Sequence, residues 1–407
     1  MKCGLLGRKL GHSYSPQIHA YLGDYSYDLF EREPEDVESF LKNGDFSAIN
    51  VTIPYKKTVM PYCRLTPTAE YMGSVNTVIR QEDGSLLGHN TDYFGFTSMV
   101  KRSGLEPKGK KCLVLGSGGA SVTAVAVLKE MGANVVVISR GGENNYENLR
   151  RHSDAAIICN CTPVGMYPNN GITPVDLDLF PRLEGVLDMI YNPSRTKLLM
   201  DAADRGLIHC NGLWMLVAQA KEAAEWFLGQ KLPDAMIQTV YDKMRLQMEN
   251  IILIGMPGCG KSTVGESLAA HLGKQFVDAD AELVKIFGRS IPDIFAKEGE
   301  EGFRSKETQI LSELGKRSGL IIATGGGCVT RQENDPLLHQ NGTIVWLQRD
   351  LDQLPTDGRP LSQKNKLSDM YAVRKPLYEA FSDVTIDNGG SVHDTVSMIL
   401  TKLEAQK

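Results

Sequence analysis

Two glycine-rich turns, each set between an apolar segment and a helical segment, constrain the fold of this chain most. The first turn lies in VLGSGGA, which ends at Ala120, and the second is GMPGCGKST at residues 255–263. Glycine lets backbone N–H groups turn toward phosphate oxygens, and a helix that begins at the turn adds the positive end of its dipole. The sequence therefore predicts two phosphate-binding turns, each after a buried strand.

Length and composition limit the class of protein. The chain has 407 residues, which predicts two or three domains, and strand-like and helix-like segments alternate throughout, which favours α/β folds with mainly parallel sheets. The net charge is −5 and no basic run is present, so we expect no nucleic-acid partner. Apolar runs such as NIILIG are too short for a membrane span.

The expected location follows from the N-terminus and the cysteines. The first residues, MKCGLLGRKLGHSYSP, lack the apolar core of a signal peptide, and the eight cysteines are scattered. We therefore expect a cytoplasmic protein with reduced thiols and no membrane association. The oligomeric state stays open.

The second turn fits the pattern G-x-x-x-x-G-K-[ST] from Gly255 to Ser262. The strand-like NIILI precedes it and the helical TVGESLAAHL follows, which is the context that a P-loop requires. Lys261 is expected to reach the β and γ phosphates of ATP, and the Ser262 hydroxyl to hold Mg²⁺.

Five short motifs follow the P-loop, and in this order they resemble shikimate kinase over residues 249–407. Taken alone, each piece is weak, and a lone Arg304 is more often a solvated surface residue. The motifs are FVDAD with Asp278 and Asp280, EGEEGFRSKE with Arg304, IIATGGGCV with Gly325–Gly327, GRPL with Arg359, and VRKPLYE with Arg374.

The resemblance implies a role for each matching residue. Catalysis is assigned to Lys261, Asp280 and Arg359, with Asp280 orienting or deprotonating the attacking hydroxyl and Arg359 on a lid. Mg²⁺ is assigned to Ser262 and Asp278. The residues expected to bind ATP are Gly258, Cys259, Gly260, Lys261, Ser262, Thr263 and Arg359. The residues expected to bind the second substrate, with arginines for its carboxylate, are Asp280, Arg304, Gly325, Gly326, Gly327 and Arg374.

The segment before Arg359 departs from that family. Family members have a longer helical segment after the strand that ends at Leu347, with an arginine that stacks on adenine. Here QRDLDQLPTDG is short, and Arg349 is the arginine available.

The first turn predicts a dinucleotide site. The segment KKCLVLGSGGASVTAVAVLKEMG reads as strand, turn and helix, with the pattern G-x-G-G-A at Gly116–Ala120. The next strand, NVVVISR, ends at Arg140, where such folds bind the ribose. A basic residue at this place favours the 2′-phosphate of NADP over NAD.

Seven further motifs surround this turn, and in this order they resemble shikimate dehydrogenase over residues 1–247. A lysine in a lone PYK would be a surface residue, but here it follows NVT. The motifs are GHSYSPQIHA, NVTIPYK, GSVNTV, GHNTDYFGF, NCTPVGM, DMIYNPSRTKLL and GLWMLVAQA.

That resemblance implies a substrate domain formed by 1–95 and 213–247, an NADP domain formed by 96–212, and a kinase domain at 248–407. Lys56 and Asp92 are the implied catalytic pair, because a lysine beside a carboxylate can supply the proton that a reduced ketone needs. The residues expected to bind substrate are Ser13, Ser15, Thr52, Lys56, Asn76, Asp92, Tyr191 and Gln219. The residues expected to bind NADP are Gly116, Ser117, Gly118, Gly119, Ala120, Ser139, Arg140, Met189 and Gly212.

The cofactor domain is also shortened. Asn160 follows Arg140 by only 20 positions, in a segment where the family fits another strand and helix. Family members read Asn-Arg-Thr where this chain has Ser139, Arg140 and Gly141. We expect a smaller Rossmann-like sheet.

Together the two resemblances imply consecutive reactions in aromatic amino-acid biosynthesis: reduction of 3-dehydroshikimate with NADPH, then phosphorylation of shikimate by MgATP. Two alternatives stay open. One is specificity for quinate or another polyol acid, and the other is a non-catalytic regulator that senses such ligands.

Overall fold

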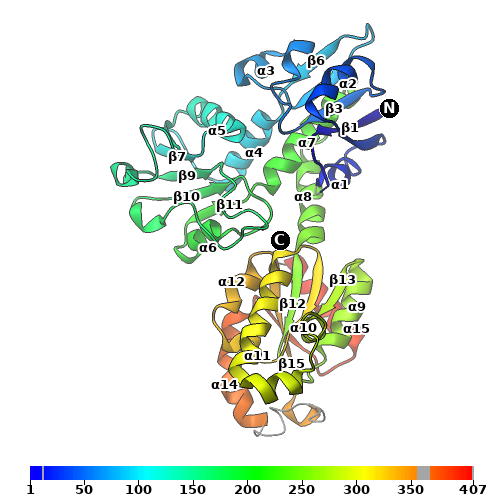
Figure 1. The fold of residues 1–407 in the computed structure, drawn as a ribbon, viewed down its shortest axis with the longest axis vertical. Coiled ribbons are helices and arrows are strands. Elements are labelled where there is room, and N and C mark those ends of the chain that lie inside the picture. The colour runs from blue at the N-terminus through cyan, green and yellow to red at the C-terminus, as the bar shows by residue number, and fades with distance from the viewer. Residues whose placement is uncertain (12, 355–366, 406–407) are drawn as a thin grey trace. The chain divides into compact units, whose positions relative to one another are not determined.

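The structure is a computed structural model that describes residues 1–11, 13–354 and 367–405. Contacts between residues divide the chain into two compact units. One comprises residues 1–164, 173–191 and 201–244, and the other comprises 165–172, 192–200 and 245–407. Three sheets form the framework, one from residues 2–89, one from 111–210 and one from 250–387 (Figure 1).

The first sheet has the strand order β2-β1-β3-β5-β6-β4. Its strands are β1 (Lys2–Gly7), β2 (Ser26–Glu31), β3 (Ala48–Val51), β4 (Arg64–Leu65), β5 (Thr77–Arg80) and β6 (Leu86–His89). β1 pairs in parallel with β2 and β3, while β5 is antiparallel to both β3 and β6. Its helices are α1 (Ser15–His19), α2 (Val37–Asn43) and α3 (Pro67–Met72). An apolar cluster with Leu6, Ile49 and Val78 fills one side of this sheet.

The second sheet is entirely parallel, with the order β11-β10-β9-β7-β8. Its strands are β7 (Lys111–Leu115), β8 (Asn134–Ile138), β9 (Ile157–Asn160), β10 (Gly185–Asp188) and β11 (Ile208–Cys210). Helices α5 (Gly119–Glu130) and α6 (Lys197–Asp204) belong to it. β8 is an edge strand, and a 3₁₀ turn at Leu149–His152 is the one helical element between β8 and β9. The shortened cofactor sheet expected from the sequence is therefore confirmed.

Two helices connect these sheets. They are α4 (Asp92–Ser103) and α7 (Leu213–Leu228), and α7 is followed by α8 (Ala235–Met248). α4 and α7 approach closely at Gly95, where an added Cβ would come within 2.8 Å of both the Gln219 Cβ atom and the Met215 carbonyl oxygen. Because a methyl group has no room there, glycine is required at this position.

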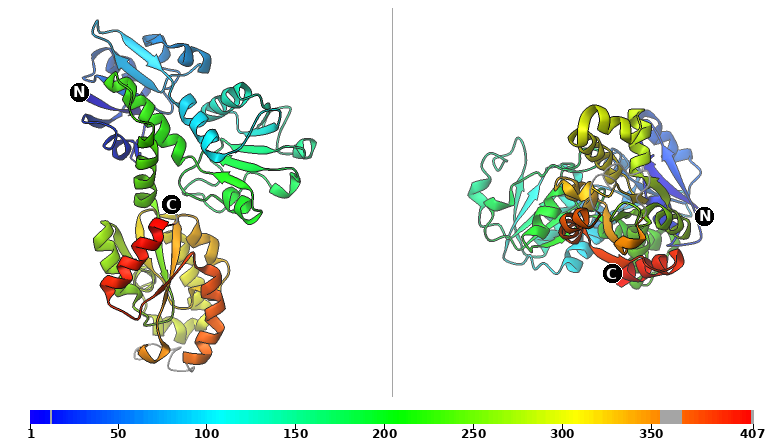
Figure 2. Two further views of the ribbon diagram at one scale, coloured as in Figure 1. Left: turned by 180° about the vertical axis from the view of Figure 1, so that it is seen from behind. Right: turned by 90° about the horizontal axis from the view of Figure 1, so that it is seen from below.

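The third sheet is also parallel, with the order β13-β14-β12-β15-β16. Its strands are β12 (Asn250–Ile254), β13 (Gln275–Asp278), β14 (Leu320–Ala323), β15 (Gly342–Gln348) and β16 (Val384–Asp387). Its helices are α9 (Lys261–Leu272), α10 (Ala279–Phe287), α11 (Ile291–Lys316), α12 (Asn334–His339), α14 (Leu367–Phe381) and α15 (Val392–Ala405). α9 and α15 cover one face of the sheet and α12 and α14 the other (Figure 2).

The core of the third sheet follows from its sequence. All five residues of β12 are buried, as a continuous apolar strand between two helical layers requires. The α/β class with mainly parallel sheets, predicted from the alternating pattern, is confirmed. Among the described residues, no helix combines the length and the apolar character needed to cross a membrane.

Candidate active sites

A cavity of about 460 Å³ lies between the first and second sheets. It is lined by all eight residues that the sequence assigns to the dehydrogenase substrate. They come from the segment before α1 and its first residue, the turn after β3, the residue before β5, the start of α4, the segment after β10, and α7. Asn50 of β3 also lines the cavity, but the sequence did not predict it. A single asparagine within a buried strand has no feature that distinguishes a ligand-binding residue from a polar residue of the core.

Lys56 and Asp92 form an ion pair at this cavity. The Lys56 Nζ atom donates to the Asp92 Oδ2 atom across 2.5 Å, and both side chains are at most a third exposed. Asp92 is the first residue of α4, where its own N–H donates to the Asn90 side chain. The two residues are 36 positions apart in the chain, and the fold joins them as the resemblance implied.

The two serines lie at the start of α1. Ser13 is held by its N–H, which donates to the Leu10 carbonyl, and its hydroxyl oxygen accepts the Ser15 N–H at 3.2 Å. Because that oxygen acts as the acceptor, the Ser13 hydroxyl proton remains available to a ligand in the cavity.

The cofactor side of the cavity is shaped by close backbone approach. Met189, Tyr191, Gly212 and Ala120 line the cavity. A Cβ at Gly212 would stand 2.1 Å from the Met189 carbonyl oxygen, so only glycine fits where α7 begins beside the end of β10.

The first glycine turn fits a dinucleotide. Gly116 has φ +102°, which glycine adopts readily, and α5 begins at Gly119. A Cβ at Gly118 or Gly119 would meet no atom within 4 Å, so both face open space that a pyrophosphate can enter. Of the residues assigned to NADP, Ala120, Met189 and Gly212 line the cavity; those that do not are Gly116, Ser117, Gly118, Gly119, Ser139 and Arg140.

Ser139 and Arg140 follow the end of β8. The Ser139 N–H donates to the Asn144 carbonyl at 3.1 Å, so the short segment after β8 folds back on the strand end. The Arg140 side chain is exposed and pairs with no carboxylate among the described residues. Its guanidinium is thus available to an anionic group of the cofactor.

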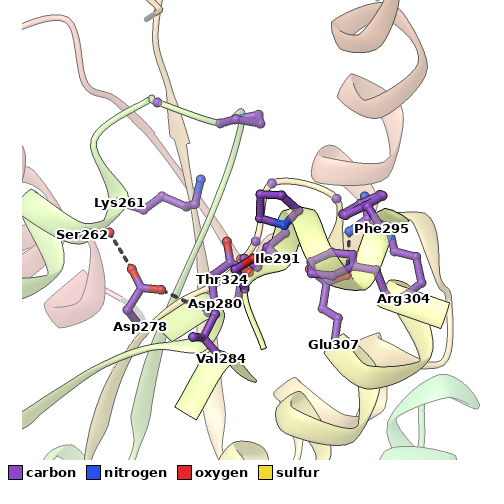
Figure 3. A pocket seen from close by; sticks show the side chains of 18 of the residues that line it. Lys261, Ser262, Asp278, Asp280, Val284, Ile291, Phe295, Arg304, Glu307 and Thr324 are labelled. Atoms are coloured by element: carbon purple, nitrogen blue, oxygen red, sulfur yellow. Dashed lines mark hydrogen bonds and ion pairs between the residues drawn. The ribbon is translucent and has the colours of Figure 1, made fainter. Parts of the chain in front are cut away.

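A second cavity, of about 650 Å³, lies at the carboxyl ends of β12, β13 and β14 (Figure 3). Three glycines of the P-loop have positive φ: Gly255 (+141°), Gly258 (+84°) and Gly260 (+99°). The Lys261 Nζ atom donates to the Gly255 and Met256 carbonyls at 3.0 and 3.1 Å. The sequence context therefore produces the loop that its pattern predicts.

The P-loop fits ATP and Mg²⁺. Ser262 donates to Asp278 Oδ2 at 2.8 Å, so a hydroxyl and a carboxylate lie together at the start of α9. Mg²⁺ is commonly held by one or two such oxygens together with phosphates and water. Of the residues that the structure describes, no three His, Cys, Asp or Glu side chains form a metal-binding group.

Asp280 lies between the P-loop residues and the arginine side of the cavity (Figure 3). It is the second residue of α10, which is capped by the Asp278 carboxylate. Burial, together with the nearby carboxylates of Glu307 and Asp278, raises the pKa of Asp280 to about 6. A carboxylate of this kind can accept a proton near neutral pH.

Two arginines lie against the glycine triplet. A Cβ at Gly327 would stand 2.1 Å from Arg304 Nη2, and Arg374 Nη1 donates to the Gly326 carbonyl at 3.0 Å. Both arginine side chains are buried. Because the three glycines carry no side chains, the two guanidinium groups can lie against their backbone on one side of the cavity.

The structure adds Glu307 to this site. Its Oε2 atom accepts from Arg304 Nη1 at 2.7 Å, and its Oε1 atom is buried without a hydrogen-bond partner. A Cβ at Gly325 would stand 2.4 Å from that oxygen. Glu307 follows Arg304 by three positions on the same helix, and this spacing, which brings side chains together, was the sequence signal that could have identified it.

Two other predictions have different outcomes. Cys259 does not line the cavity, since its side chain is fully buried under the loop. Arg359 lies outside the described residues. The remaining predicted residues of this half line the cavity: Gly258, Gly260, Lys261, Ser262, Thr263, Asp278, Asp280, Arg304, Gly325, Gly326, Gly327 and Arg374.

Comparison with known families agrees with this geometry. Residues 5–78 match the family model of the shikimate dehydrogenase substrate binding domain, and residues 257–404 match that of shikimate kinase. The shikimate dehydrogenase (NADP(+)) of Clostridium perfringens is 36% identical over 267 residues, which cover 60% of this chain and 97% of that protein.

Solved structures show the same likeness. Shikimate dehydrogenase 1 from Peptoclostridium difficile is 36% identical with a TM-score of 0.55, and the match covers 60% of this chain and 97% of that one. The enzyme from Thermus thermophilus in complex with NADP(H) and shikimate is 29% identical with a TM-score of 0.55, over 60% of this chain and 99% of that one. The chain therefore belongs to the shikimate dehydrogenase family and carries a shikimate kinase domain in its C-terminal part, so that one polypeptide joins two enzymes.

Proposed function

We propose that the chain reduces 3-dehydroshikimate to shikimate with NADPH and then phosphorylates the 3-hydroxyl of shikimate with MgATP. The observation that carries the first step is the Lys56–Asp92 pair in a cavity lined by eight polar or aromatic residues of family type. The observation that carries the second is a P-loop whose cavity also holds Asp280, Arg304 and Arg374.

In the first reaction, NADPH supplies the hydride to the ketone carbon. Lys56 donates a proton to the oxygen that becomes the new hydroxyl, and Asp92 keeps the ammonium group in place. The hydroxyls of Ser13 and Ser15 bind the carboxylate. Ring oxygens and the carboxylate are further bound by Thr52, Asn76, Asp92, Tyr191 and Gln219.

The adenosine end of the cofactor is assigned to the second sheet. The turn at Gly116–Ala120 binds the pyrophosphate, and Ser139 and Arg140 bind the 2′-phosphate, which selects NADP. Met189 and Gly212 border the nicotinamide end. Exposure of Arg140 and the open space beside Gly118 and Gly119 support this assignment.

In the second reaction, ATP supplies the phosphoryl group. Arg304 and Arg374 bind the carboxylate, the glycine triplet borders the ring, and Asp280 accepts the proton of the attacking hydroxyl. Lys261 neutralises phosphate charge, and Ser262 and Asp278 hold Mg²⁺. Arg359 remains assigned to a lid by resemblance alone.

The organisation of the chain is proposed with the function. A substrate domain at 1–95 and 213–247, an NADP domain at 96–212 and a kinase domain at 248–407 agree with the three separate sheets. A cytoplasmic location and small-molecule substrates, with no nucleic-acid partner, complete the proposal.

One mixture tests the order of reactions. The purified protein is incubated with 3-dehydroshikimate, NADPH and MgATP, and products are followed by phosphorus NMR. We expect shikimate 3-phosphate, which disappears in Lys56→Ala and in Lys261→Ala, while Lys261→Ala still oxidises NADPH. A protein that consumes neither cofactor contradicts the proposal and favours a regulator. In a parallel assay with 3-dehydroquinate, faster reduction of that compound than of 3-dehydroshikimate would change the assigned substrate.

A further inference from the structure

The side chain of Asn388 contacts the P-loop from outside the kinase cavity. Asn388 directly follows β16, its side chain is buried, and it does not line the cavity. Its Nδ2 atom donates to the Cys259 carbonyl at 2.6 Å, and an added Cβ at Gly260 would stand 2.7 Å from the same nitrogen. The segment after β16 therefore holds a loop that lies 129 positions earlier in the chain.

Two further hydrogen bonds fix Asn388 in this position. Its own N–H donates to the Gln348 carbonyl, at the end of β15, at 2.7 Å. Its Oδ1 atom accepts from the hydroxyl of Thr395, a buried residue of α15, at 2.6 Å. A carbonyl oxygen can only accept, so the amide nitrogen must be the atom that faces Cys259. The Asn388 amide thus has one orientation, with its donor toward the P-loop.

The carbonyl that Asn388 binds belongs to the peptide between Cys259 and Gly260. This peptide is trans, so its C=O and N–H groups point in opposite directions and the Gly260 N–H points away from Asn388. Gly260 lines the cavity, whereas the Cys259 side chain is buried under the loop. Within the described part of the chain, no hydrogen bond uses the Gly260 N–H. This N–H is therefore available to a ligand in the cavity.

The direction of this peptide depends on an outside contact because Gly260 is a glycine. Gly260 has φ +99°, and glycine adopts positive and negative φ about equally well, so its own conformation does not prevent the peptide from rotating. A rotated peptide would present the Cys259 carbonyl in place of the Gly260 N–H. The partial negative charge of that oxygen would repel a phosphate.

We propose that Asn388 is a positioning residue for ATP, which it serves by holding the Cys259–Gly260 peptide so that the Gly260 N–H faces the phosphates. The inference rests on the proposed function, in which the second cavity binds MgATP. Backbone N–H groups of a P-loop bind phosphate oxygens, so the direction of this peptide decides whether one such bond forms. A bond to an ionised phosphate is about twice as strong as one between neutral groups.

Asn388→Leu tests the proposal, because leucine has a similar volume and no donor. Binding of MgADP to the full chain is measured by titration calorimetry, which does not depend on the second substrate. We expect the Kd for MgADP to rise about tenfold or more, as loss of one hydrogen bond to a charged group predicts. The KM for ATP should rise by a similar factor, while the KM for shikimate should change less than about twofold.

Asn250→Leu is the matched control. Asn250 is also buried, and its Nδ2 atom donates to the Arg317 carbonyl at 2.7 Å. It begins β12, whereas the P-loop follows the other end of that strand. Both variants remove a buried amide that donates to a carbonyl, so both should lower the stability toward denaturant. Only Asn388→Leu should weaken the binding of MgADP.

Thr395→Val provides a second variant should Asn388→Leu fold poorly. Valine keeps the shape of threonine and removes the hydroxyl that holds the Asn388 oxygen. We expect the Kd for MgADP to rise about two- to fivefold. Adding Thr395→Val to Asn388→Leu should cause no further increase, because Thr395 acts through Asn388.

The outcomes are distinct. An unchanged Kd for MgADP in Asn388→Leu and in Thr395→Val overturns the inference and leaves the proposed function intact. An equal rise in Asn250→Leu also overturns it, because general loosening of the unit would then explain the loss. Failure of the unaltered chain to bind MgADP contradicts the proposed kinase function itself, and with it the basis of the inference.

Discussion

The Nζ atom of Lys56 and the Oδ2 atom of Asp92 lie 2.5 Å apart at the dehydrogenase cavity, although one residue follows β3 and the other begins α4. The pair couples the turn after one strand of the substrate sheet to the first helix that leads to the cofactor sheet. Both residues line the cavity, so the Lys56 ammonium group can exchange a proton with a ligand bound there.

Loss of the Lys56 ammonium is expected to slow dehydrogenation. Lys56→Met should lower kcat by about 10²- to 10⁴-fold, the usual contribution of a positioned acid or base, with the KM for NADPH nearly unchanged. Steady-state oxidation of NADPH measures this. Lys57→Met is the matched control, because Lys57 is an exposed neighbour, and equal losses in both variants would contradict the role of Lys56.

Arg140 is expected to select the cofactor. Arg140→Ala should raise the KM for NADPH about tenfold or more by removing a charge-assisted hydrogen bond, and leave the KM for NADH unchanged. Kinetics with both cofactors provide the measurement. Arg150→Ala, an exposed arginine further along the chain, should change neither value. Equal increases for NADPH and NADH in Arg140→Ala would rule out recognition of the 2′-phosphate.

The kinase should lose activity in mild acid. Burial and two neighbouring carboxylates raise the pKa of Asp280 to about 6, so its proton-accepting form is lost as the pH falls through about 6. The kcat/KM for shikimate should therefore decline below that pH, because this ratio reports ionisation of the free enzyme. A decline centred near the ordinary pKa of an aspartate would contradict this, and Asp280→Asn should be inactive at every pH.

Gly327 is expected to be required for Arg304. An added Cβ would stand 2.1 Å from Arg304 Nη2, so Gly327→Ala must displace the guanidinium. The KM for shikimate should rise about tenfold or more, with a smaller change in the KM for ATP. In Gly390→Ala the new Cβ would lie 3.7 Å from its nearest neighbour, which is ordinary contact, so its KM for shikimate should stay unchanged.

His339 is expected to make the stability of the C-terminal unit depend on pH. Burial lowers the pKa of this imidazole, but hydrogen bonds to Asp335 and Asp383 outweigh burial and raise it to about 9. Because the folded pKa exceeds the unfolded one, the stabilisation is complete below a pH of about 6.5 and is lost as the pH rises through about 9.

The measurement is chemical unfolding of the C-terminal unit, followed by fluorescence of the buried Trp346. His339→Gln should lower the free energy of unfolding by about 1–3 kcal/mol near pH 6 and by much less near pH 10. An equal loss at both values would mean that the charge of His339 does not contribute.

The sequence predicted those parts of the sites that lie in contiguous motifs. The two glycine turns, the strands before them and the helices after them are where the patterns place them, because positive φ angles and helix starts demand particular residues locally. The shortened cofactor sheet was also visible, since too few residues separate Arg140 from Asn160 for another strand and helix.

Residues that act through other side chains could not be predicted in this way. Glu307 lies in a segment rich in both acidic and basic residues, which resembles the solvated face of a helix. Its side chain is nevertheless buried against Arg304. Tyr27 and Asn50 lie in two ordinary strands, β2 and β3. The hydrogen bond between their side chains depends on the register of both strands with β1. Such contacts arise from tertiary packing, which local patterns do not encode.

The missing side chain at Gly95 has a mechanical consequence for the dehydrogenase. Because α4 and α7 touch there with no room for a methyl group, the backbones of the two helices are closely packed at this crossing. We therefore expect Asp92 at the start of α4 and Gln219 on α7 to move together. We also expect that entry of substrate and departure of product depend on the turns that border the cavity, and that the distance between these two polar groups changes little during turnover.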